Sequence, residues 1–123
     1  MTTLALLHTG TFLASIFTDL CHEAMPDVEV FNIVDESLIK NTIAANKLTP
    51  QTSRRLVEYL KSAEEAGADA ILVTCSSIGP AVEAAQQFIN IPVLRVDVPL
   101  ADLAIASGSR IGVVATLPTT LKP

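Results

Sequence analysis

Residues 69–80 read Asp-Ala-Ile-Leu-Val-Thr-Cys-Ser-Ser-Ile-Gly-Pro, an apolar run followed by small residues and a proline. The apolar run at residues 70–74 predicts a buried parallel strand, and Pro80 is tolerated in the first turn of a helix, where a missing N–H costs little. Cys75 therefore falls at the carboxyl end of a strand, the edge at which open α/β sheets bind ligands. A helix that begins after it would favour the thiolate over the thiol. We expect Cys75 to be the centre of a functional site.

The rest of the chain alternates between strand and helix patterns. Strands are expected over residues 4–8, 28–34, 93–96 and 110–115, and helices over residues 12–24, 49–67, 80–90 and 99–106. Residues 38–48 have a weaker helical pattern and could cover the mouth of a site. This alternation predicts an α/β fold, a three-layer sandwich in which helices cover both faces of an open parallel sheet. In the usual strand order of such a sheet, the first and third strands are neighbours.

Composition excludes several classes of function. The chain has 123 residues, enough for one domain with a proper core, and its eight basic residues are scattered within a net charge of −5, so no nucleic-acid-binding face is expected. No apolar run approaches the about 20 residues of a membrane span, and no leader pattern opens the chain, so we expect a cytoplasmic protein without membrane contact. Two cysteines and two histidines at unsuitable spacings predict no metal site.

Polar residues end the expected strands, and because the strands are parallel these ends should open on one side of the sheet. The pairs are His8-Thr9, Asp35-Glu36 and Cys75-Ser76. With the first and third strands adjacent, His8 or Thr9 could lie near Cys75, and a Cys–His pair would suit nucleophilic hydrolysis. Asp35 and Glu36 either cap the following segment or contribute to the site. The second cysteine, Cys21, lies on the apolar stripe of the first helix and is expected to serve packing.

Several segments resemble one known family. Residues 69–77 are similar to the strand–Cys–Asn/Ser–Thr/Ser segment of the aspartate/glutamate racemase superfamily, which also contains hydantoin racemases, maleate isomerases and arylmalonate decarboxylases. Residues 91–94 and 110–120 resemble the fourth strand of that family and the turn that opens its second domain. Residues 34–38 resemble the loop after its second strand. The resemblance covers nearly the whole chain.

The resemblance implies one half of a pseudo-twofold, two-domain fold. Residues 1–109 would be the N-terminal domain, and residues 110–123 the opening strand and turn of a second domain that this chain lacks. It implies a cofactor-independent racemase or isomerase of a small amino acid or carboxylate. Cys75 would be one of two thiols that move a proton at the α-carbon from opposite faces. The substrate-binding residues expected with it are Ser76, Ser77, His8, Thr9, Asp35, Glu36, Thr116 and Thr119.

Two departures from the family pattern keep alternatives open. His8-Thr9 stand where amino-acid racemases usually have Asp-Ser, and the second cysteine belongs to the missing domain. The first alternative is a non-catalytic α/β module that binds a small anion or a partner at the same strand ends. A weaker alternative is a Cys–His hydrolase. We also expect a homo-oligomer, or association through the face meant for the missing domain, because that face would expose apolar surface.

Overall fold

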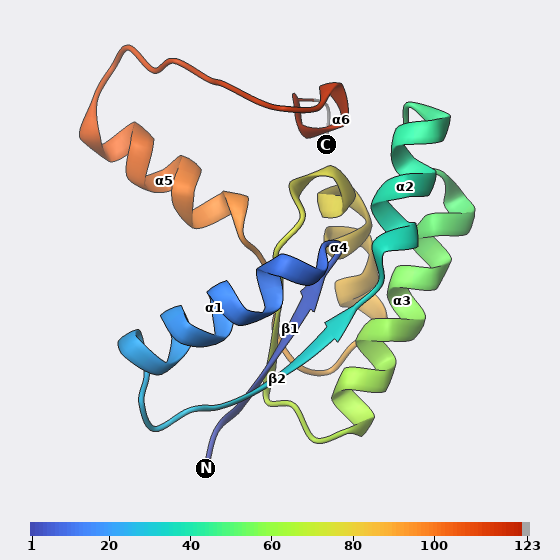
Figure 1. Ribbon diagram of the computed structural model, residues 1–123, viewed down its shortest axis with the longest axis vertical. Helices are drawn as coiled ribbons and strands as arrows, with labels where there is room; N and C mark the ends of the chain where they lie inside the picture. The colour runs from blue at the N-terminus through green and yellow to red at the C-terminus, as the bar shows by residue number, and fades with distance from the viewer. Residues whose placement is uncertain (122–123) are drawn as a thin grey trace.

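Within residues 1–121, which the computed structural model describes, four parallel strands form one sheet. Its order is β2-β1-β3-β4, so the first and third strands are neighbours, as predicted. The strands are β1 (Thr3–His8), β2 (Glu29–Val34), β3 (Ala70–Val73) and β4 (Val93–Arg95). Figure 1 shows this sheet between α1 on one side and α3 and α4 on the other.

The helices follow the strands in the order that βαβ units require. They are α1 (Thr11–Ala24), α2 (Glu36–Ala45), α3 (Pro50–Glu65), α4 (Gly79–Ala85), α5 (Asp97–Ser107) and α6 (Pro118–Leu121), with 3₁₀ turns η1 (Ser76–Ile78) and η2 (Gln86–Phe88). The weak helical pattern near residue 40 is thus a real helix, α2. No helix in residues 1–121 combines the length and the apolar character needed to cross a membrane.

Local chemistry explains where α2 and α3 begin and end. Asp35 caps α2, and its carboxylate accepts a 2.8 Å hydrogen bond from the Ser37 N–H. Thr49 caps α3 in the same way, and Pro50 occupies its first turn. Gly67 follows α3 with a φ of +100°, a left-handed conformation that glycine adopts without steric cost. The chain can therefore turn directly from α3 toward β3.

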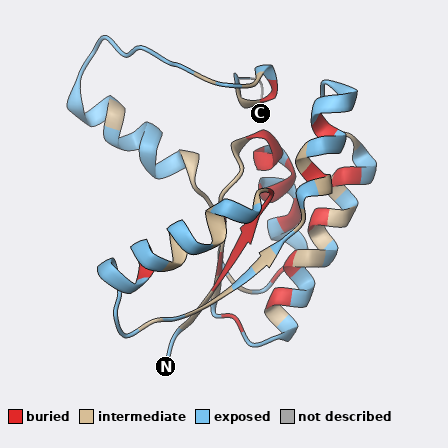
Figure 2. Cartoon of the chain, in the orientation of Figure 1, coloured by how far each residue is buried: buried red, intermediate tan, exposed pale blue. Residues whose placement is uncertain are grey.

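Alternate residues of β1 face opposite sides of the sheet, as strand geometry requires. Ala5 and Leu7 belong to the buried core formed with Leu56 and Leu60 of α3. His8 faces the other side, where its ring lies 5.8 Å from that of Phe17 on α1. Figure 2 shows the buried residues concentrated in β1, α3 and α4. The predicted α/β class and the covering of both sheet faces are confirmed.

The prediction of a strand over residues 110–115 is wrong for the described structure. This segment pairs with no strand within residues 1–121, and Val114 is 98% exposed. A β-branched apolar run forms a strand only when a neighbouring strand satisfies its backbone N–H and C=O groups. Residues 122–123, the end of the expected second-domain opening, lie outside the described residues. The preceding helix, α5, is longer than predicted, and none of its residues is buried.

Candidate functional site

Cys75 lies where the sequence placed it, directly after β3. Its backbone is extended, with φ −114° and ψ 114°, and it occupies the N-cap position of η1. The side chain is half-buried and packs against the apolar core. η1 leads into α4, which begins at Gly79. Cys75 therefore sits at the carboxyl edge of the sheet and is only partly buried.

Two predicted site residues that are 42 positions apart meet next to this turn. Ser77 is buried within η1, and its Oγ lies 2.9 Å from the Oγ1 of Thr119. Thr120 Oγ1 lies 3.4 Å from the same Ser77 oxygen. These hydroxyls tie α6 to η1, which brings the C-terminal part of the described chain over the segment that follows Cys75.

His8 is buried among hydrogen-bond partners on the α1 side of the sheet. Its Nδ1 lies 2.7 Å from Thr74 Oγ1, and its Nε2 lies 2.7 Å from Asn32 Oδ1. The Asn32 amide nitrogen donates to Thr18 Oγ1, which directs the amide oxygen toward His8, so His8 Nε2–H is the donor. Burial lowers the pKa of His8, and the hydrogen bond to Asn32 only partly opposes this shift. Burial therefore favours the neutral form of the ring.

Strand alternation keeps His8 away from Cys75. Leu7 pairs with Val73, so the next pair in that register is His8 with Thr74, whose side chains are hydrogen-bonded on one face of the sheet. Cys75, one residue further on, packs on the core at the opposite face. Within the described residues, no hydrogen bond joins Cys75 to His8. The Cys–His pair needed for a hydrolase is not formed in this arrangement.

Asp35 is enclosed by groups from two helices. Its Oδ1 accepts from the Ser37 N–H at 2.8 Å and from Ser37 Oγ at 2.6 Å, while its Oδ2 accepts from Arg55 Nη2 at 2.7 Å and from the Tyr59 hydroxyl. Burial favours the neutral carboxyl, but the bonds from Ser37 and Tyr59 and the Arg55 charge together lower the pKa of Asp35. The hydrogen bond to Asp35 raises the pKa of Tyr59. Asp35 thus serves as the cap of α2 and joins it to α3.

The remaining predicted site residues differ in their surroundings. Thr9 is buried behind the end of β1, and Ser76 is half-buried in η1. Glu36 is exposed in the first turn of α2, and Thr116 is exposed before α6. Ser76 and Ser77 therefore form the turn directly after Cys75, and Thr119 is hydrogen-bonded to it. Thr116 is left at the surface.

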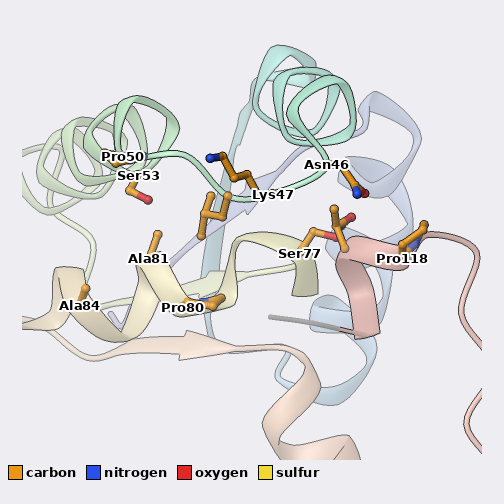
Figure 3. A pocket seen from close by; sticks show the side chains of 11 residues that line it. Asn46, Lys47, Pro50, Ser53, Ser77, Pro80, Ala81, Ala84 and Pro118 are labelled. Carbon is orange, nitrogen blue, oxygen red and sulfur yellow. Dashed lines mark hydrogen bonds between the residues drawn. The ribbon is translucent and has the colours of Figure 1, made fainter.

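A cavity of about 550 Å³ opens beside Ser77, between the loop from α2 to α3, helix α4 and α6 (Figure 3). Its lining residues are Asn46, Lys47, Leu48, Pro50, Ser53, Ser77, Pro80, Ala81, Ala84, Pro118 and Thr119. Ser77 and Thr119 were predicted as site residues, but Cys75 does not line this cavity. Asn46, Lys47 and Ser53 also line the cavity and were not among the predicted site residues, although the first two lie in the segment 38–48 that was expected to cover a site.

A comparison with models of known protein families covers nearly the whole chain. The family model of Asp/Glu/hydantoin racemases matches residues 8–123. The chain belongs to the Asp/Glu/hydantoin racemase family. The resemblance found in residues 69–77 is thereby confirmed, and the matched region takes in Cys75, Ser77 and Thr119. A search of curated proteins gives no match to the chain.

Side chains suited to acid–base chemistry are few at this edge of the racemase-family chain. Among the described residues, no three His, Cys, Asp or Glu side chains gather as metal ligands would. Cys21, on α1, is buried, and that burial raises the pKa of its thiol. His8 and Asp35 are already engaged by neighbouring side chains. Cys75, by contrast, is only partly buried at the strand edge.

Proposed function

We propose that this family member is a cofactor-independent racemase or isomerase that moves a proton at the α-carbon of a small amino acid or carboxylate. The observation that carries the proposal is the half-buried Cys75 thiol at the carboxyl edge of β3, in a chain that belongs to this family. A cysteine thiolate is a competent base near neutral pH, and its thiol can return the proton. Cys75 is therefore the proposed proton-transfer residue.

Inversion at a carbon requires a base on one face and an acid on the other. Cys21 is a poor second group because it is buried on α1, with a raised pKa. We therefore assign the second group to a further domain or to a second copy of the chain. A surface for such association exists on α5, whose exposed apolar side chains include Val98, Leu100, Leu103 and Ile105.

We assign direct contacts with the substrate to Ser76, Ser77 and Thr119. Hydroxyl and backbone N–H groups in a tight turn are suited to a carboxylate. His8, Thr9 and Asp35 would shape the surroundings, because they are buried or already hydrogen-bonded. Glu36 and Thr116 are exposed and would contact substrate only from the open side.

The test is hydrogen–deuterium exchange at the α-carbon, followed by proton NMR in D₂O with aspartate, glutamate and 5-methylhydantoin as substrates. Cys75→Ala should lower the exchange rate at least about 100-fold, the lower range for loss of one acid–base group. Cys21→Ala is the matched control, since it removes the other thiol, and it should retain exchange. Far-UV circular dichroism shows whether each variant is folded. Equal rates in wild type and Cys75→Ala would refute the assignment of Cys75.

A further inference from the structure

The cavity beside Ser77 has an apolar floor and polar ends. Pro80, Ala81 and Ala84 of α4 form part of its wall, with Leu48 and Pro50 from the opposite loop. Its volume of about 550 Å³ falls within the range of small-molecule sites, which is about 300–1,000 Å³. The middle of the cavity therefore offers apolar surface to the alkyl chain of a small ligand.

Lys47 gives one end of the cavity a positive charge. No acidic side chain lines the cavity, and none of the ion pairs found within residues 1–121 involves Lys47. In the view of Figure 3, the Lys47 side chain ends on the side of Ser53. Ser53 donates its hydroxyl hydrogen to the Thr49 carbonyl oxygen at 3.1 Å, so Lys47 is the donor available to an anion there. An ammonium without a carboxylate partner favours an anionic group in the ligand.

Uncharged hydrogen-bonding groups occupy the other end. Asn46 lies on the side of Ser77 in Figure 3, and none of the hydrogen bonds found in the described chain uses its side-chain amide. Ser77, Thr119 and Thr120 share two hydrogen bonds among three hydroxyls, which leaves one O–H hydrogen and free lone pairs. This end suits a hydroxyl or a carbonyl oxygen of the ligand.

We propose that this cavity is a binding site for a short-chain carboxylate with a hydroxyl or carbonyl group at its far end. The carboxylate binds Lys47, the alkyl chain lies along Ala81 and Ala84, and the far oxygen bonds to Asn46 and to the Ser77–Thr119 hydroxyl pair. The inference rests on the proposed function in sharing Ser77 and Thr119 with the proposed substrate contacts, and it adds Lys47 and Asn46 to that region; Cys75 does not line the cavity. Binding here therefore does not depend on the thiol.

The test uses 6-hydroxyhexanoate, with 1,6-hexanediol as the ligand without charge and hexanoate as the ligand without the hydroxyl. Binding is followed by ¹H–¹⁵N NMR titration of the full chain. 6-Hydroxyhexanoate should shift the amide signals of Ala81 and Ala84, and should bind more tightly than either control ligand. Lys47→Gln should weaken its binding about two- to fivefold, the range of a solvent-accessible ion pair, and leave 1,6-hexanediol unchanged.

Matched variants separate this site from general charge effects. Lys40→Gln removes an exposed lysine of α2 that does not line the cavity, and should leave the affinity unchanged. Asn46→Gly keeps the left-handed backbone at φ +53° while removing the amide, and should reduce the advantage of 6-hydroxyhexanoate over hexanoate. Cys75→Ala should bind as wild type does while losing α-carbon exchange, so failure of this proposal and failure of the proposed function are distinguishable. Absence of shifts at Ala81 and Ala84 at the solubility limit, or equal losses in Lys40→Gln and Lys47→Gln, overturns the proposal.

Discussion

Protonation of His8 should destabilise the folded chain in mild acid. The ring is fully buried, and burial lowers its pKa from the ordinary value of 6.5. The unfolded chain therefore binds a proton at His8 at a higher pH than the folded chain does. Stability rises with pH wherever the unfolded state binds more protons, so it should fall as the pH drops below about 6.5.

The loss of unfolding free energy is largest if the buried ring takes up no proton in the folded chain. If folded His8 stays neutral throughout, lowering the pH from about 7.5 to about 5.5 costs the free energy of protonating an unfolded histidine of pKa 6.5. That free energy is about 1.4 kcal/mol, and it is an upper limit because the folded ring gains some proton at the lower pH. Asp35 does not contribute in this window, because its carboxyl has an ordinary pKa of 3.8 and a lower one when folded.

The measurement is urea denaturation followed by far-UV circular dichroism at a series of pH values across this window. Wild type should lose up to about 1.4 kcal/mol of unfolding free energy toward the acid end. His8→Gln should be less stable at every pH, because it alters the bonds to Asn32 and Thr74, but its stability should be nearly flat with pH. His22→Gln, at an exposed position of α1, is the control and should keep the wild-type slope.

Two outcomes contradict this reasoning. A wild-type free energy that is constant from neutral pH to about pH 5.5 means that the folded ring takes up its proton as readily as the unfolded chain. A slope that persists unchanged in His8→Gln means that a group other than His8 causes the pH dependence. Either result removes the argument that His8 is held neutral by burial.

Three further predictions concern stability and association. Leu60→Ala should lower the unfolding free energy by about 2–5 kcal/mol in urea titration, because it empties a fully buried core position; a loss under about 1 kcal/mol contradicts that. Asp35 stabilises the fold above its ordinary pKa and loses this effect as the pH falls further, so Asp35→Asn should cost about 1–3 kcal/mol at neutral pH and flatten the acid dependence below about pH 4. Light scattering should detect association of the wild-type chain that Leu103→Lys reduces, and a wild-type monomer contradicts association through α5.

The strands and their order were largely predictable because they depend on local patterns and a general rule. Residues 70–74 form an apolar run too short for a helix, and β3 appears there. Parallel crossovers of one hand then place β1 beside β3. The position of Cys75 was found in the same way, directly after the run at residues 70–74.

The errors arose where a residue's state depends on partners distant in sequence. Residues 110–115 have the composition of a strand, but a strand requires a neighbour for its backbone groups, and none lies beside them in residues 1–121. His8 was expected near Cys75 from the adjacency of their strands. Register and side-chain alternation instead direct His8 to Thr74 and Asn32.

The α/β class and the position of Cys75 directly after a buried strand could be read from the sequence alone, because apolar periodicity and turn residues act over short distances. Which groups meet depends on the packing of the whole fold: Ser77 contacts Thr119, Asp35 contacts Arg55 and Tyr59, and Lys47 lines the cavity beside α4. These contacts join segments separated by about 20 to 40 residues. Their geometry follows from how the helices pack on the sheet, and no local pattern contains that information.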